Sequence, residues 1–139
     1  MARIVSFMIC DTVNNIPAPT NDGIIQTLVA PQIAVRPQFV PGNFSFGIAV
    51  GVSGIDLKKE NSVRFTIADP DGKVIQNSGS STLPAVSDKD TLPEDYQGFI
   101  LSMDIRNLTI EKEGCYLFRI FINDEEIGER EIPVYKRGK

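Results

Sequence analysis

With 139 residues, of which 42% are apolar and 23% charged, the chain has the size and balance of one soluble globular domain, and we expect residues 1–139 to form it. The net charge of -4 argues against a nucleic-acid partner. Histidine is absent, which excludes Ser-His and Cys-His nucleophile pairs and histidine-containing zinc sites.

Two cysteines, Cys10 and Cys115, are too few for a disulfide-rich scaffold. Both lie inside apolar strand patterns, so we expect two buried free thiols in a reducing compartment. Residues 1–11 lack the long apolar segment and the cleavage site of a signal peptide. Proline, glycine and polar residues break every low-charge stretch, so no membrane span and no membrane partner are expected, and the expected location is the cytoplasm.

The N-terminal part of the chain predicts two strands, Ile4–Ile9 and Ile24–Ala30. Residues 14–23 between them are rich in Asn, Pro, Asp and Gly, which is typical of a loop. Residues 33–35 can add a short edge piece, because the prolines that follow prevent regular pairing inside a sheet.

The central stretch, residues 44–53, alternates with a period of two and predicts a strand with one bulky and one nearly bare face. The bulky side chains, expected in a sandwich core, are Phe44, Phe46, Ile48, Val50 and Val52. The small ones are Ser45, Gly47, Ala49, Gly51 and Ser53. Glycine inside a strand commonly marks close approach of another backbone. Either the proline-rich N-terminal segment lies across this face, or the face is a flat, uncharged docking surface for a second subunit or another protein.

The following segments also read as strands and turns. Residues 62–68 alternate cleanly, Asp69-Pro70-Asp71-Gly72 is a strong turn signal, and residues 73–76 return as the hairpin partner. Residues 77–97 are polar and without periodicity, which predicts a long loop that is either functional or merely mobile. The alternating residues 62–68 and 115–123 place Arg64 and Arg119 on the outward phase, where they either bind an anion or lie on a solvated sheet face.

Strands are also expected in residues 99–105, 115–123 and 126–135. Ile127 and Ile132 cannot share one face in strict alternation, so a bulge or an edge near Gly128 or Pro133 is expected. Many short strands without a helical period predict an all-β, antiparallel, Ig-like β-sandwich of about 7–9 strands. Tyr116, which enters a late strand after a polar turn, is placed like the tyrosine corner of such sandwiches.

Carboxylates suggest one alternative site. Asp69 and Asp71 in the turn, with Asp88, Asp90 and Asp95 in the long loop, could converge at one end of the sandwich and hold Ca²⁺. The alternative is a turn beside a solvated acidic loop. No EF-hand spacing is present, so we expect no metal, no cofactor and no catalytic residues.

Several segments together resemble a known family, namely residues 7–11, 24–29, 63–74, 114–120 and 126–129. They are similar to a family of small bacterial and prophage-type β-sandwich proteins known only as a domain of unknown function. The resemblance implies an intracellular sandwich without an assigned activity, and it supplies no catalytic residues. The loop at residues 77–97 does not match it.

The sequence therefore predicts a non-enzymatic binding or assembly module, whose partner is a protein or a second copy of the chain. The candidate interaction surface is the set of small residues in the central stretch, Ser45, Gly47, Ala49, Gly51 and Ser53. Two alternatives remain: a sandwich that binds a small ligand, Ca²⁺ or carbohydrate through the acidic loop, and a phage or virion accessory component.

Overall fold

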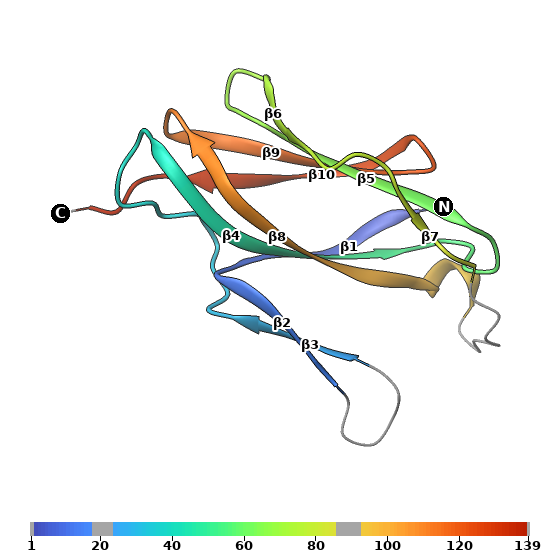
Figure 1. Ribbon diagram of the computed structural model, residues 1–139. Helices are drawn as coiled ribbons and strands as arrows, with labels where there is room; N and C mark the ends of the chain where they lie inside the picture. Colours follow the sequence, from blue (N-terminus) through green and yellow to red (C-terminus); the bar gives the residue numbers. More distant parts are fainter. Residues whose placement is uncertain (1, 18–23, 86–92, 139) are drawn as a thin grey trace.

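Two antiparallel sheets pack face to face in the computed structural model, which describes residues 2–17, 24–85 and 93–138 (Figure 1). The first sheet has the order β1-β4-β8, with β1 Arg3–Cys10, β4 Gly42–Ser53 and β8 Gly98–Ile110. The second sheet has the order β10-β9-β5-β6, and β7 also pairs with β5. Its strands are β5 Asn61–Ala68, β6 Val74–Asn77, β7 Ser81–Leu83, β9 Gly114–Ile122 and β10 Glu125–Val134. The prediction of an all-β, Ig-like antiparallel sandwich is confirmed.

A separate hairpin and one short helical turn complete the described chain. The hairpin pairs β2 Thr12–Pro17 with β3 Ile24–Val29 and projects from one end of the first sheet (Figure 1). The 3-10 helix η1 spans Glu94–Tyr96 and leads into β8. In the described residues no helix is long and apolar enough to cross a bilayer.

The core lies between the two sheets and is built from alternate residues of their strands. Four of the five bulky residues that the alternation of the central stretch places in the core are buried, namely Phe46, Ile48, Val50 and Val52. Phe44, beyond the register shift with β8, is only partly buried. Opposite these residues of β4 lie the inward residues of β9: Tyr116, Phe118, Ile120 and Ile122. Burying a large apolar side chain of this kind contributes about 1.5–3 kcal/mol. These two strands therefore supply much of the apolar stabilisation.

Tyr116 forms the tyrosine corner that its position predicts. Its ring is 1% exposed, and its hydroxyl donates a hydrogen bond of 2.8 Å to the carbonyl oxygen of Lys112. The bond satisfies the buried hydroxyl and fixes the turn that leads into β9.

The strand pairings contain four register shifts. One lies between Ile67 and Ala68 where β5 pairs with β6, and the other three lie in β10, in β1 and between β4 and β8. In β10 the register shifts between Glu126 and Gly128, which confirms the bulge expected near Gly128. In β1 the shift lies between Ile4 and Ser6. The third lies where β4 and β8 pair, next to Asn107, whose φ of 54° is in the left-handed region.

Three expectations are wrong. A loop was expected from residue 14, but residues 12–17 form β2, because the asparagines there pair with β3. The rest of the expected loop, residues 18–23, lies outside the described residues. The expected loop at residues 77–97 contains β7, although residues 86–92 are not described. Cys115 is exposed, because Tyr116 takes the inward phase of β9.

Residues 32–37 close one lateral side of the sandwich, between β1 and β10. The amide of Gln32 donates to Ile9 O at 2.7 Å, and the amide of Val35 donates to Pro133 O at 2.8 Å. Tyr135 N in turn donates to Val35 O at 3.1 Å. The expected edge piece at residues 33–35 is therefore a bridge between the edges of the two sheets.

Candidate functional site

The outer face of the first sheet carries the candidate residues. From β4 it contains Ser45, Gly47, Ala49, Gly51 and Ser53, and we call it the small-residue face. Its neighbours on β1 are Val5, Ser6, Met8 and Cys10, and those on β8 are Ile100, Ser102 and Asp104. Gly47, Ala49 and Gly51 therefore each lie between larger side chains of the two flanking strands.

One end of this face is covered by the chain itself. A Cβ added to Gly47 would lie 3.0 Å from Cys10 Sγ, 3.3 Å from Val13 Cγ2 and 3.4 Å from Thr12 Cα. Farther along the face, opposite Gly51, the side chain of Gln26 in β3 donates a hydrogen bond of 3.2 Å to Ile100 O. The hairpin thus lies over this end, as in the first of the two sequence alternatives, and glycine is required because β2 approaches so closely.

In the middle of the face the floor is buried and the rim is exposed. Ala49 is 8% exposed, and Gly51 is also buried, beside Val5 and Ser6. The bulge in β1 turns both of these side chains outward. Val5, Met8 and Ile100 are 56%, 40% and 58% exposed, and we call these three residues the apolar rim. The accessible apolar surface therefore belongs to β1 and β8, and the pattern of β4 alone did not indicate it.

Ser45 and Ser53, at the two ends of the small-residue face, do not present free hydroxyl groups to solvent. The hydroxyl of Ser45 accepts a hydrogen bond of 2.9 Å from the amide of Asn107, which stabilises the bulge in β8. Ser53 is buried, and within the described residues its hydroxyl has no hydrogen-bond partner. Neither hydroxyl projects freely from the face.

The outer face of the second sheet is covered by charged side chains that contact one another or an aromatic ring. Arg119 Nε lies 3.5 Å from Glu126 Oε1 and 3.6 Å from Glu129 Oε2. The guanidinium of Arg64 lies 3.9 Å above the centre of the Phe121 ring, in cation–π contact. Both arginines are therefore engaged within this face, as expected for a solvated sheet face rather than for an anion site.

The aspartates of the turn act as turn formers. Asp69 Oδ1 accepts hydrogen bonds from the amides of Asp71 and Lys73, at 3.0 and 2.9 Å, and the Asp71 carboxylate pairs with Lys112. Asp88 and Asp90 lie outside the described residues. Among the residues that are described, no three His, Cys, Asp or Glu side chains are grouped to hold a metal ion.

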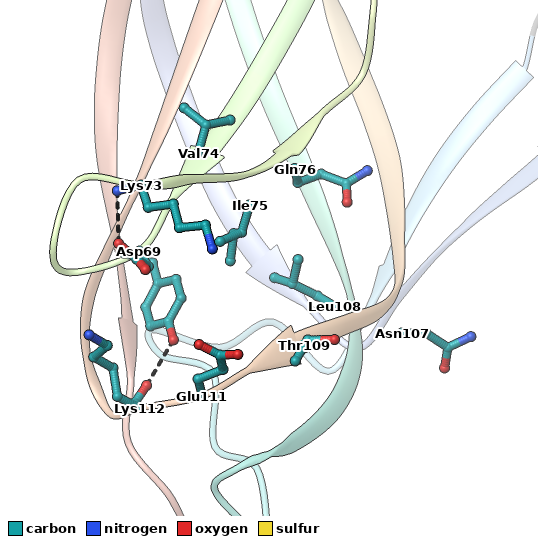
Figure 2. Close-up of a pocket in the computed structure, with 11 residues that line it drawn as sticks. Asp69, Lys73, Val74, Ile75, Gln76, Asn107, Leu108, Thr109, Glu111 and Lys112 are labelled. Carbon is teal, nitrogen blue, oxygen red and sulfur yellow. Dashed lines mark hydrogen bonds between the residues drawn. The ribbon is translucent and has the colours of Figure 1, made fainter.

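A polar groove of about 460 Å³ lies beside the tyrosine corner, between β6 and the end of β8 (Figure 2). Lys73 and Lys112 line it together with the acidic Asp69 and Glu111, so that its charges balance. Burial raises the pKa of the Tyr116 phenol, and its proton is held by Lys112 O. The Tyr116 phenol is therefore held in its neutral form as a hydrogen-bond donor beside this groove.

The two thiols are also poor nucleophiles. Burial raises the pKa of Cys10, and the nearby Asp104 and Asp11 add to this shift. Desolvation also raises the pKa of Cys115, and a contact with Glu131 adds to it. Because the thiolate is the reactive form, neither thiol is activated as a catalytic nucleophile.

Three known structures resemble this sandwich at low sequence identity. A DNA glycosylase, AlkC from Pseudomonas fluorescens bound to DNA with an abasic-site analogue, aligns with a TM-score of 0.44 and 14% identity over 96% of this chain, which spans 30% of the glycosylase. The sensor domain of the anti-sigma factor RsgI4 from Pseudobacteroides cellulosolvens aligns with a TM-score of 0.38 and 16% identity, over 78% of this chain and 92% of that domain. An immunoglobulin-like protein from Pseudomonas aeruginosa aligns with a TM-score of 0.39 and 16% identity, over 96% of both chains.

No curated protein matches the sequence. A family of unknown function, DUF6941, matches residues 5–135, which contain all of the strands of both sheets except the first two residues of β1. The chain therefore belongs to the family of unknown function DUF6941.

Proposed function

We propose that the protein is a non-enzymatic binding module whose partner is another protein, and that the small-residue face with its apolar rim is the contact surface. The observation that carries this proposal is the apolar rim itself. Three large apolar side chains, 56%, 40% and 58% exposed, surround a floor of small, uncharged residues. Clustered apolar surface of this kind favours association, because burying it releases water and does not require any charged group to lose its hydration.

Several features favour a protein over other partners. The cores of protein interfaces are depleted in charged residues, and the middle of this face, around Ala49 and Gly51, carries none. A metal or nucleic-acid partner would need clustered carboxylates or a basic patch in its place. The phenol and thiols described above are not activated for chemistry, which supports a role in contact rather than in turnover.

Affinity capture with matched variants tests the proposal. The tagged full chain is compared with a Met8→Glu, Ile100→Glu double variant in extracts of its native cells. Both side chains are exposed, so the double variant should remain folded, as checked by circular dichroism. Leu117→Glu, on the outer face of the second sheet, is the control. Partners should be lost from the double variant and retained by the control.

The opposite pattern would contradict the proposal, as would equal capture by all three proteins. Substitution of Gly47 is unsuitable for this test, because Gly47 lies beneath Cys10 and Val13. Light scattering of the same samples identifies a second copy as the partner, if the mass doubles for the control and not for the double variant.

A further inference from the structure

One lateral edge of the first sheet is unpaired in the described part of the chain. β8 pairs only with β4 there. Gln97 O accepts hydrogen bonds from the amides of Gly54 and Ile55, at 2.8 and 3.1 Å, so the backbone groups of Gln97 face β4. In an antiparallel ladder this orientation alternates. Phe99, Leu101, Met103 and Ile105 therefore also face β4, whereas the N–H and C=O groups of Gly98, Ile100, Ser102 and Asp104 point away from the sheet.

A side-chain amide already occupies one of these outward positions. Gln26 Nε2 donates a hydrogen bond of 3.2 Å to Ile100 O, which confirms the direction of that carbonyl. A glutamine amide has the same donor chemistry as a peptide group. The edge can therefore accept an amide donor from outside the ladder.

An apolar groove of about 210 Å³ runs beside the same edge, between β8 and the strands β5 and β7. Its apolar lining is Val63, Phe65, Leu83, Leu101 and Met103. A strand added beside β8 would direct every second side chain into this groove, and the others toward the small-residue face.

The straight part of the edge is short. The register shift between Ile105 and Leu108, with Asn107 at a φ of 54°, interrupts the ladder beyond Ile105. Such a bulge bends a strand and ends regular pairing on its free side. The straight edge therefore runs from Gly98 to Ile105, and a strand added along all of it would replace Gln26 as the donor to Ile100 O.

We propose that this edge binds an extended peptide segment of a partner protein by strand addition, with apolar residues of the peptide at every second position. The inference rests on the proposed binding role and specifies the conformation and the pattern of the partner. Alternating backbone donors and acceptors are complemented by an extended chain, and the narrow groove accepts alternate side chains of one segment. A second copy of the chain is an alternative outcome of the test.

Amide hydrogen exchange of the full chain tests whether the edge is free. The amides of Ser102 and Asp104 should exchange much faster than those of Leu101 and Met103, which bond to β4. Equal, strong protection of all four amides in a monomeric sample would overturn the proposal. The same protection in a dimeric sample that is lost on dilution would identify a second copy as the occupant and would also overturn it.

Peptide binding tests the occupant. The probe is a capped seven-residue peptide with alternating valine and threonine between terminal lysines, followed by NMR of the full chain. Binding should shift the amide signals of Ile100, Ser102 and Asp104 and slow the exchange of the latter two. The same peptide N-methylated at its threonines should bind about tenfold more weakly or worse, because it lacks edge donors.

Variants of Ser102 separate the edge from the face. Ser102→Pro removes an outward N–H without removing a bond to β4, and proline is tolerated on edge strands. Peptide affinity should fall about tenfold in this variant and stay unchanged in Ser102→Ala. Unchanged affinity in a folded Ser102→Pro, or equal binding of the methylated peptide, would overturn strand addition. Met8→Glu should leave peptide binding intact, so failure of the contact face and failure of the edge are distinguishable.

Discussion

The two outer faces of the sandwich differ in what covers them. On the second sheet, Arg119 pairs with Glu126 and Glu129, and Arg64 lies over Phe121. On the first sheet, the strand at the centre presents serine, glycine and alanine, and exposed apolar side chains lie beside its middle. The charged Arg3 and Asp104 lie toward the two ends of this face. Both faces belong to antiparallel sheets, which commonly pack one side on the core and expose the other.

The difference shows where association is energetically feasible. A partner on the second sheet would have to desolvate several charged groups that already interact with one another and with water. A partner on the first sheet would cover Val5, Met8 and Ile100 and would displace water from apolar surface. The contact proposed above is therefore assigned to the small-residue face and not to the charged face.

The largest expected effect is in the reactivity of the two thiols, one on each outer face. Cys115 should react with a soluble disulfide reagent in the native protein, whereas Cys10, which is 0% exposed beneath the hairpin, should react only in denaturant. The reagent thiolate released, measured before and after denaturation, gives the number of cysteines that have reacted in each state. Rapid reaction of both thiols in the native state would show that the hairpin does not cover its end of the face.

The Cys10 thiol also predicts how the free energy of unfolding changes with pH. Because burial raises the folded-state pKa of Cys10 above its ordinary value of 9.0, the native protein holds this proton more tightly than the unfolded chain does. The resulting stabilisation is fully present below pH 9 and is lost as the pH rises through the folded-state pKa. Urea titrations above pH 9 should show a smaller decline in unfolding free energy for Cys10→Ala than for the native sequence.

Next in size is the effect of a side chain placed on the floor of the small-residue face. Gly47→Leu should lower the free energy of unfolding by about 1–3 kcal/mol, because its side chain must displace Cys10 and Val13. Urea denaturation measures the change. Ser6→Leu, at an exposed position on the same face, is the control and should change stability by less than about 0.5 kcal/mol. An unchanged free energy of unfolding in Gly47→Leu would mean that the hairpin does not pack against Gly47.

A smaller effect is expected from the ion pairs of the opposite face. Arg119→Gln should lower the free energy of unfolding by about 0.2–1 kcal/mol, because the Arg119 side chain is only one-third exposed and both partners are more exposed. The loss should shrink in 1 M salt, where the Debye length is about 3 Å. A loss that is independent of salt would assign Arg119 a packing role instead.

The smallest effect on stability is expected at the apolar rim. Met8→Gln should change the free energy of unfolding by less than about 0.5 kcal/mol, because 40% of the Met8 side chain already faces solvent. The same variant should weaken partner capture. Strong destabilisation without loss of capture would assign Met8 to the fold and not to contact.

Much of the sandwich follows from periodicity in the sequence. The alternation of residues 44–53 identified the buried face of β4, and the placement of Tyr116 identified the tyrosine corner. Gly128 marked the bulge in β10, where two apolar residues could not share a phase. Each of these signals is local, so one strand or turn suffices to show it.

The features that were missed depend on pairing between distant segments. β2 reads as a loop because its asparagines and proline disfavour strands, and only pairing with β3 makes it one. The apolar rim combines residues of β1 and β8, almost a hundred positions apart, through their common pairing with β4. A single bulge in β1 moves Val5 outward, and the periodicity of one strand does not reveal such a shift.

Site-specific cross-linking compares the two faces most directly. A photo-reactive benzophenone amino acid is placed at Met8 on the first sheet or at Leu117 on the second, and the full chain is irradiated in its native cells. The account predicts a discrete adduct from position 8 that disappears when Ile100→Glu is added, with no equivalent adduct from position 117. An adduct from position 117 alone, or one from position 8 that Ile100→Glu leaves unchanged, would contradict it.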